Sequence, residues 1–407
     1  DLIVTADIGI RDHASVQAAY EGGVDVLICD HHITSNESVP SRAIVLCPPQ
    51  ATCTYPNPHL AACGVSFKLA QALLEHHPKR HLILPSMMKL VAIGTVADLV
   101  PMNNSENRAL VQLGLAELNR GPHHPGLTAL LEVSGDEVGH INTVDLGYRL
   151  GPRINAAGRL ADASMIVRLL TCRDPYQAKQ LAKQLDSLNA ERRVVQDRIT
   201  KEALSQIGEH APSAIVVAGD EKAGWHRGVV GIVASRLKDE YHRPSAVLSI
   251  QGDEAVGSMR SIDQVHAVEC LESVSDLLVR FGGHPKAAGF TVKSAHINQL
   301  RERMNAFVDQ HIDRQNLVLT RRFDCEVNLN ELNNSTRQEL LRLGPFGMGN
   351  PQPRLLVRNI PVSNVQVRGK TGSLVKFQLG TNRRDIEAIW WGQSAHAAAL
   401  TAQPVDL

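Results

Sequence analysis

At three places in this sequence, acidic and imidazole side chains could bind a metal ion or take part in catalysis. Asp30-His31-His32, Asp7 and Asp98 each follow a short apolar run. Carboxylate and imidazole groups together suit Mn²⁺ or Zn²⁺, and carboxylates shared between two ions suit the hydrolysis of phosphoesters. Taken alone, the tripeptide also fits a chance surface sequence, and each single aspartate also fits a helix or turn cap. Their common position after apolar runs predicts three strand ends that meet at one metal centre.

These side chains need a sheet that brings them to one edge, and residues 1–150 predict such a sheet. Apolar and β-branched runs typical of strands lie at 2–5, 26–29 and 43–47. Residues with the period of amphipathic helices lie at 12–21 and 64–76. Strands that alternate with helices at this spacing indicate βαβ units and a mostly parallel sheet, whose carboxyl edge is where ligands bind.

The chain changes character twice after this lobe. Residues 174–207 follow a shorter helical segment at 162–170 and form a long, highly charged helical pattern, which indicates a solvated connector. A second α/β lobe is predicted by strands at 214–218, 245–250 and 255–259 and by helices at 228–241 and 265–279. Short strands of a small β-barrel are predicted at 317–325, 355–357, 362–367, 374–379 and 385–390.

We therefore expect an α/β protein with two α/β lobes joined by a long helix and followed by a β-barrel. The predicted domains are a catalytic lobe at 1–160, a connector helix at 161–210, a second lobe at 211–315 and the barrel at 316–407. The sequence opens inside a strand without a Met. We expect it to be a piece of a longer protein.

The amino-acid composition is that of a folded globular protein. The 407 residues are 43% hydrophobic, which is typical of folded globular proteins and excludes a disordered chain. No apolar run approaches the roughly 20 residues of a membrane span. The seven cysteines form no C-x-x-C pair, so a reducing, cytoplasmic compartment is expected.

Charge is distributed unevenly although it sums to zero. The whole chain has 42 Lys and Arg against 42 Asp and Glu. From residue 316 onward there are eleven basic and seven acidic residues, a net charge of +4, which leaves −4 for the rest. A basic excess in the barrel segment suits a surface that binds nucleic acid.

The ordered set of motifs resembles the DHH phosphoesterase superfamily and, within it, the bacterial single-stranded-DNA exonucleases. The tripeptide alone is a weak signal, whereas the ordered set is specific and runs through the whole chain. The motifs lie at 4–7, 30–32, 94–101, 106–108, 151–160, 225–232, 257–261, 282–290 and 344–351.

The resemblance implies roles for the metal-centre residues. Asp7 corresponds to an aspartate that bridges two ions, and His31 and Asp98 correspond to further ligands. His32 corresponds to a residue near the scissile phosphate, and Asp30 would orient the histidines, as ligating imidazoles usually require. The family's first motif, Asp-x-Asp, would lie before residue 1. We therefore expect the chain as given to bind metal poorly and to be inactive.

The implied activity is hydrolysis of single-stranded DNA from its 5′ end by a two-metal mechanism with Mn²⁺ or Mg²⁺, in DNA repair and recombination. The implied partners are single-stranded DNA, single-strand-binding protein and repair helicases. No association with a membrane is expected, and the protein is expected to be a monomer. The C-terminal segment resembles an OB-fold, which binds single strands with a basic groove and stacking aromatics. Candidate platforms are Phe346, Phe377, Trp390 and Trp391, although most aromatics of a small barrel are core residues.

The second lobe resembles the DHH-associated domain and would hold the phosphates of the substrate. The implied set is Asn155, Arg159, Ser258, Arg260, Gly282, Gly283 and His284. Glycine allows close approach to a phosphate, and guanidinium binds phosphate in a bidentate manner. Plainer alternatives stay open, because Arg159 could pair with Asp162, Asn155 could cap a helix, and Gly-Gly-His could be only a turn.

Other functions also stay open. An oligoribonuclease or cyclic-dinucleotide phosphodiesterase of the same superfamily typically lacks the connector and the barrel. A non-catalytic nucleic-acid-binding scaffold would have degraded metal motifs, and Asp7, His31, His32 and Asp98 are intact here. Trp225-His226 either stacks on a base or anchors the helix that follows.

Overall fold

The computed structural model of the chain describes residues 1–32, 39–312, 320–369, 374–380, 386–392, 394–402 and 404–407. The chain divides into two compact units. One unit consists of Asp1–Ala116 together with Arg321–Leu407, and the other is Glu117–Thr320. Within the described residues no helix has the length and apolar character that crossing a membrane requires.

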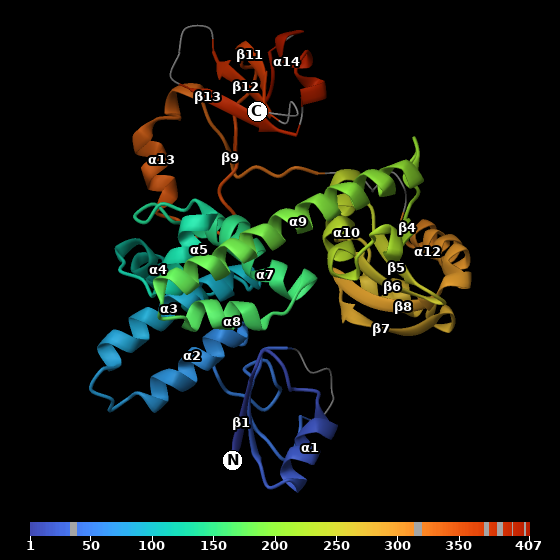
Figure 1. The fold of residues 1–407 in the computed structure, drawn as a ribbon. Helices are drawn as coiled ribbons and strands as arrows, with labels where there is room; N and C mark the ends of the chain where they lie inside the picture. The colour runs from blue at the N-terminus through green and yellow to red at the C-terminus, as the bar shows by residue number, and fades with distance from the viewer. Residues whose placement is uncertain (33–38, 313–319, 370–373, 381–385, 393, 403) are drawn as a thin grey trace. The chain divides into compact units, whose positions relative to one another are not determined.

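A small parallel sheet opens the first unit. Its strands are β1 (Leu2–Ala6), β2 (Asp25–Cys29) and β3 (Ile44–Leu46), in the order β1-β2-β3, and α1 (His13–Glu21) joins the first two (Figure 1). Val16 of α1 packs against Val26 and Ile28 of β2. The three predicted strands, the first helix and the parallel arrangement are confirmed.

The expected alternation of strands and helices is wrong beyond β3. The next elements are all helices: α2 (Ala62–Leu73), α3 (Arg80–Ala97) and α4 (Ser105–Arg120). The apolar run before Asp98 is therefore the last part of α3 and not a strand. Val91, Ala92 and Ile93 are buried, and a helix buried on most sides has the same continuous apolar sequence as a buried strand.

The second unit begins with helices. They are α5 (Pro125–Ser134), α6 (Thr143–Asp145), α7 (Gly151–Leu160), α8 (Ser164–Thr171) and α9 (Pro175–Ile207). Asp174 caps α9 by accepting a hydrogen bond from the backbone of Gln177 at 2.8 Å. The long predicted helix is confirmed, but it is not solvated on all sides, because Ala178, Ala182 and Leu185 are fully buried where α9 packs on α5 and α7.

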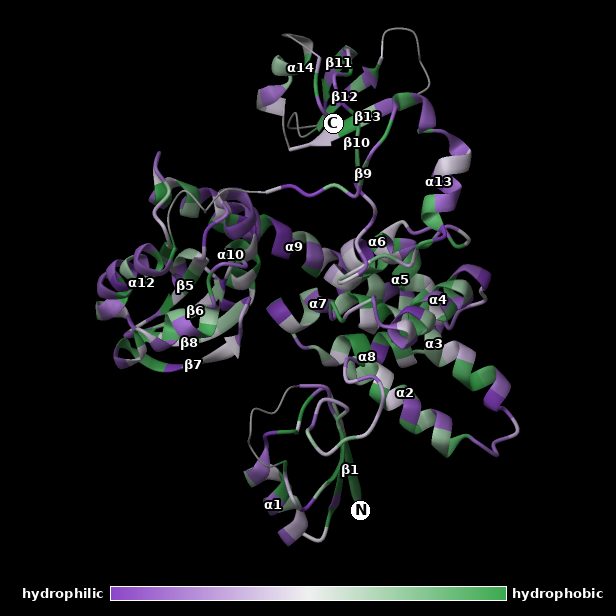
Figure 2. Cartoon of the chain, turned by 180° about the vertical axis from the view of Figure 1, so that it is seen from behind, coloured by the Kyte–Doolittle hydropathy of each residue, from purple (hydrophilic) through white to green (hydrophobic). Residues whose placement is uncertain are grey.

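A mixed five-stranded sheet follows, in the order β4-β5-β6-β8-β7. Its strands are β4 (Ile215–Asp220), β5 (Ser245–Gln251), β6 (Glu254–Arg260), β7 (Leu278–His284) and β8 (Ala287–Lys293). β4 and β5 are parallel and the other pairs are antiparallel. One face packs on α10 (Arg227–Tyr241) and α9, and the other packs on α11 (Ala267–Glu272) and α12 (Ile297–His311). In α12, hydrophilic residues alternate with the hydrophobic ones that reach this core (Figure 2).

The helix predicted at 265–279 is correct only for its first half. α11 ends at Glu272, and residues from Leu278 onward form β7. The sequence there fits either structure, and pairing with β8 decides it, since strand preference depends on neighbours across the sheet.

The C-terminal segment has a three-stranded antiparallel sheet of β11 (Val362–Arg368), β12 (Leu374–Leu379) and β13 (Glu387–Trp391). β9 (Cys325–Glu326) pairs with β10 (Leu355–Leu356), and α13 (Asn334–Leu341) lies between them in sequence, with α14 (Ala399–Ala402) near the end. Over its described part the segment forms no closed barrel. The strand predicted at 317–325 is wrong for 320–324, and 317–319 lie outside the described residues.

Candidate metal centre

Three predicted ligands meet in the first unit. Nε2 of His31 lies 3.1 Å from Oδ1 of Asp7 and 3.3 Å from Oδ2 of Asp98. Asp7 follows β1 and His31 follows β2, as expected, but Asp98 comes from the C-terminal end of α3. His32 also contributes, because Asp7, His31 and His32 offer ligand atoms that all lie within 4.8 Å of one another. The structure thus brings all four residues to one place.

The backbone at both aspartates is turned in an uncommon way. Asp7 has φ of 68°, and Leu99, the residue after Asp98, has φ of 57°. Residues other than glycine adopt this left-handed region at a cost of roughly 1–3 kcal/mol and keep it only where the surroundings enforce it. Asp7 is held by its backbone N–H, which donates to the Cys29 carbonyl at 2.9 Å. Backbone strain next to two converging carboxylates is typical of a functional site.

Asp30 lies behind the ligand atoms and holds the histidines. Its side chain is only 1% exposed. Oδ1 accepts hydrogen bonds from the backbone of His31 at 2.7 Å and from Nδ1 of His32 at 2.7 Å, and Oδ2 accepts one from the backbone of Ile10 at 3.1 Å. Burial alone would raise the pKa of Asp30, but these hydrogen bonds outweigh it and lower the pKa below its ordinary value. Nε2 of His32 is left to face the site.

The centre suits a divalent cation. Burial raises the pKa of Asp98, and the negative charge of Asp7 raises it further, while His31 opposes both. Two carboxylates that repel each other are stabilised by a cation between them. Neighbouring ligands of an octahedral ion at about 2.1 Å lie about 3 Å apart, which matches the measured separations. Asp7 is 62% and Asp98 41% exposed, so water and substrate can reach the site.

The nearby thiol is not a nucleophile. Cys29 is 1% exposed in β2, and burial raises its pKa. Because only a thiolate attacks readily, Cys29 is a buried strand residue without a part in the chemistry.

A second group of predicted residues lies on one face of the five-stranded sheet. Nη1 of Arg260 donates to Oγ of Ser258 at 2.8 Å. In the sheet register Arg260 lies in line with His284, and Ser258 in line with Gly282. A side chain at Gly282 would meet nothing within 4 Å. The surface of the sheet at Gly282, on the same face as Ser258 and Arg260, is therefore not covered by other atoms.

The alternative that Gly-Gly-His is only a turn is wrong, because these residues are the last three of β7. Gly283 has φ of +151°, and a Cβ there would lie 2.4 Å from the Ala287 carbonyl. Any other residue would push β7 away from β8 at this point. Glycine is required here by the strand pairing itself.

Arginines without acidic partners gather near this face. Nη1 of Arg159 donates to the Gly228 carbonyl at 2.9 Å, whereas Asp162 bonds to Ser164. The alternative pairing of Arg159 with Asp162 is thus not observed. Burial lowers the pKa of Arg260, and the positive charge of Arg159 lowers it further. Within the described chain neither arginine forms an ion pair, which leaves positive charge for an anion.

Arg192 of α9 also belongs to this group, although the sequence alone did not indicate it. Burial lowers its pKa, and Arg159 is among the charges that lower it further. Its Nε is buried and has no hydrogen-bond partner. The run 191–193 looked like part of a solvated helix face, and only the packing of α9 distinguishes Arg192. Asn155 does not cap a helix, since it lies exposed in the middle of α7.

Comparisons with known proteins agree with this geometry. The DHH family N-terminal domain matches residues 1–95, the DHHA1 domain 211–310 and the RecJ OB domain 323–407. A solved structure described as exonuclease RecJ bound to manganese is 35% identical to this chain, with a TM-score of 0.63, and the match covers 78% of each chain. The chain belongs to the RecJ family.

Other relatives place it in the same family. RecJ from Thermus thermophilus, solved in complex with Mn²⁺, matches with a TM-score of 0.81 and 32% identity over 97% of this chain and 56% of that chain. The single-stranded-DNA-specific exonuclease RecJ of Bacillus subtilis is 39% identical over 392 residues, which are 95% of this chain and 48% of the relative. The chain therefore spans about half the length of these relatives. The predicted superfamily is confirmed, and so are the two α/β lobes, the long helix and the OB domain.

Trp225-His226 anchors a helix in this RecJ family member. Trp225 is 2% exposed, and its Nε1 donates to Glu202 at 2.5 Å. Nδ1 of His226 accepts a hydrogen bond from the Gly228 backbone at 3.1 Å and so caps α10. A buried indole cannot stack on a base, so the stacking alternative is wrong.

The RecJ OB domain exposes aromatic side chains on one strand. Trp391 of β13 is 67% exposed and Trp390 38%, whereas Phe377 is a core residue at 3%. Trp391 pairs with Leu374 of β12, which in turn pairs with Arg368 of β11. An indole in line with a guanidinium across a sheet is a surface on which a base can stack beside a bound phosphate.

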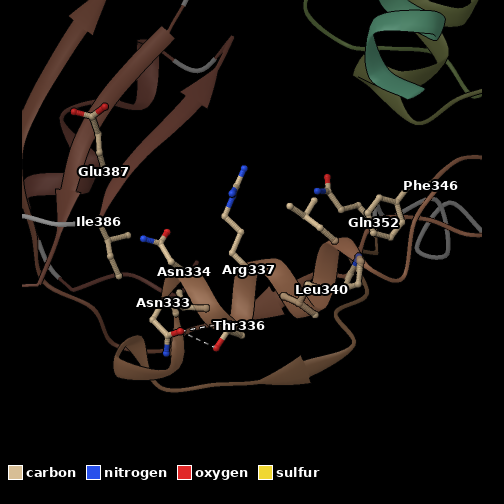
Figure 3. A pocket seen from close by; sticks show the side chains of 12 residues that line it. Asn333, Asn334, Thr336, Arg337, Leu340, Phe346, Gln352, Ile386 and Glu387 are labelled. Atoms are coloured by element: carbon tan, nitrogen blue, oxygen red, sulfur yellow. Dashed lines mark hydrogen bonds between the residues drawn. The ribbon is translucent and has the colours of Figure 1, made fainter. Parts of the chain in front are cut away.

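The same domain has a hollow of about 430 Å³ beside α13. Figure 3 shows Arg337 extending between Ile386 and Glu387 on one side and Phe346 and Gln352 on the other. None of the metal-centre residues lines it. Phe346, a predicted platform, is half-buried at its edge.

Proposed function

We propose that this chain carries the catalytic and DNA-binding parts of a metal-dependent exonuclease. It would hydrolyse single-stranded DNA from the 5′ end with two divalent ions, Mn²⁺ or Mg²⁺, in DNA repair and recombination. The observation that carries the proposal is the convergence of Asp7 and Asp98 on Nε2 of His31. The manganese-bound relatives described above support it.

Each residue of the centre has a separate task in this proposal. Asp7, His31 and Asp98 hold the metal, which when bound activates water and neutralises charge on the phosphoryl group. Asp30 accepts the Nδ1–H of His32 and so fixes its ring, which directs Nε2 of His32 toward the place of the scissile phosphate. The exposed faces of Asp7 and Asp98 leave room for the substrate.

The arginine group would bind the phosphates of the strand. Arg159, Arg260 and Ser258 offer donors without an acidic partner in the described residues. Gly282, Gly283 and His284 lie on β7, which β8 separates from the strand of Ser258 and Arg260. Buried guanidinium groups are neutralised by an anion, and phosphate matches their geometry. Asn155 has no contact that supports such a role, and it stays a prediction.

The decisive experiment uses the full-length protein and four substrates with Mn²⁺: single-stranded DNA labelled at the 5′ end, the same strand labelled at the 3′ end, duplex DNA and a dinucleotide. We expect the single strands alone to be degraded, with mononucleotides released first from the 5′ end. Cleavage of only the dinucleotide would favour the phosphodiesterase alternative. Binding of single-stranded DNA without cleavage would favour the scaffold.

Arg260→Ala is expected to weaken binding of single-stranded DNA by about threefold to tenfold and to lower the slope of log affinity against log salt by about 0.7, as for one lost phosphate contact. Fluorescence anisotropy at several salt concentrations measures both. Arg303→Ala is the matched control, because Arg303 is paired with Asp276 on the surface. Equal salt slopes for the two variants would contradict the assignment.

Trp391→Ala is expected to weaken single-stranded-DNA binding by about 1–3 kcal/mol, the usual range for one stacked base, while the melting temperature stays near that of the wild type because the indole is exposed. Tyr176→Ala removes an aromatic of similar exposure from α9 and serves as control. Anisotropy with oligothymidine, together with quenching of tryptophan fluorescence, measures the effect. Unchanged affinity would place the stacking surface elsewhere.

We also propose that the protein is located in the cytoplasm. A reducing cytoplasm would keep the seven cysteines as the free thiols seen in the structure. Single-strand-binding protein and repair helicases as partners, a monomeric state and the four domain boundaries stay predictions from the sequence.

A further inference from the structure

The segment 343–350 contacts the part of the first unit that carries Asp98. It contains most of the motif at 344–351, for which the sequence suggested no role. Nη2 of Arg108, on α4, donates hydrogen bonds to the carbonyls of Leu343 and, at 3.3 Å, Gly344. The segment is thus fastened to α4 by one guanidinium.

The segment keeps its own shape through Asn350. The backbone groups of Gly347 and Asn350 exchange hydrogen bonds of 2.9 and 3.1 Å, which close a tight turn. The Asn350 amide donates to the carbonyls of Leu343 at 3.2 Å and Pro345 at 2.9 Å. Met348 lies at the tip of this turn.

The tip of the turn reaches the loop that follows Asp98. The backbone N–H of Met102 donates to the Met348 carbonyl at 2.6 Å, and Met102 is 1% exposed. A Cβ at Gly347 would lie 2.8 Å from Cγ of Met102, so the two chains are in tight contact. Since Met102 is four residues from Asp98, a shift of the turn would move the end of this short loop.

The other side of the loop is held by α4. Asn107 is fully buried, and its amide donates to the Pro101 carbonyl at 3.0 Å. Between Asp98 and Pro101 the backbone takes the left-handed conformation at Leu99. This conformation persists only if both ends of the loop are fixed, and the contacts at Pro101 and Met102 fix the far end.

We propose that residues 343–350 form a clasp that positions Asp98 in the metal centre, with Arg108 as the positioning residue that fastens it. This inference rests on the proposed function, because it assumes that Asp98 binds metal. The clasp belongs to the same stretch of chain as the OB domain.

Hydrogen exchange, measured without metal, tests whether residues 343–350 hold the loop after Asp98 in place. In Arg108→Ala we expect the amides of Leu99, Val100 and Met102 to exchange about tenfold faster or more, because the Met102 amide loses its partner when the clasp opens. Arg108→Lys keeps a donor and should lie between the two. Arg120→Ala removes a cation from the same helix, where it pairs only with Glu117 at the surface, and should match the wild type.

Manganese binding by the full-length protein, measured by calorimetry, tests the functional part. Arg108→Ala should weaken it by about tenfold, as for loss of a residue that orients a ligand, and should lower kcat while KM for DNA is unchanged. Gly347→Ala provides a second variant that keeps every polar group and should act in the same direction. Faster exchange without weaker manganese binding would mean that the segment only stabilises the fold, and would overturn the proposal.

The outcomes separate this inference from the proposed function. If the wild type binds manganese and His31→Ala does not, the metal centre stands whatever Arg108 does. If Arg108→Ala and Gly347→Ala then bind manganese as the wild type does, only the clasp is wrong. If the full-length wild type binds none, both proposals fall together.

Discussion

His31→Ala is expected to abolish hydrolysis of single-stranded DNA, with a loss of about a thousandfold or more in kcat/KM. Nε2 of His31 is the atom on which Asp7 and Asp98 converge. Without it the two carboxylates lose their common partner, and a bound divalent ion would lose a ligand. Metal stabilisation of a phosphoryl transition state contributes several kcal/mol, and each 1.36 kcal/mol is about a factor of ten in rate.

The measurement is release of mononucleotides from labelled single strands by the full-length protein at saturating Mn²⁺. Calorimetric titration with Mn²⁺ should show at least one site lost. His76→Ala is the control, because His76 is an exposed histidine after α2. A His31→Ala variant that cleaves within tenfold of the wild type would show that another residue holds the metal.

Asp30→Ala is expected to lower the free energy of unfolding by about 3–5 kcal/mol, in the range for removing one partner from a buried charged network. The substitution leaves the backbone N–H groups of Ile10, His31 and His32 without an acceptor. Activity should fall as well, since the ring of His32 loses the hydrogen bond that orients it. Denaturant unfolding followed by circular dichroism measures the loss.

Lowering the pH should also reveal the contribution of Asp30 to the stability of the fold. Hydrogen bonds lower the pKa of folded Asp30 below that of the unfolded chain, despite burial. Its contribution to stability is therefore complete above the unfolded pKa of about 4 and is lost as the pH falls through the lower folded value. The wild type should lose stability below pH 4 more steeply than Asp30→Ala. Asp25→Ala, at the exposed start of the same strand, should follow the wild type, and parallel curves for all three proteins would contradict the assignment.

Local sequence patterns predicted much of this protein correctly. The three strands of the first sheet, the long helix at α9, and the position of Asp30, His31 and His32 after β2 all follow from short-range signals. The ordered motifs also determined the family. Such features depend on residues within a few positions of one another, which a single sequence displays.

Tertiary structure decided the rest. Asp98 ends a helix and not a strand, because a buried helix and a buried strand have the same apolar composition. β7 forms because β8 pairs with it. Arg192 is one charged residue among many on α9 until the helix packs near Arg159, and Arg108 gains a role only when Leu343, more than 200 residues later, lies beside it. These features depend on contacts between distant segments, which hydrophobic period and local propensity do not encode.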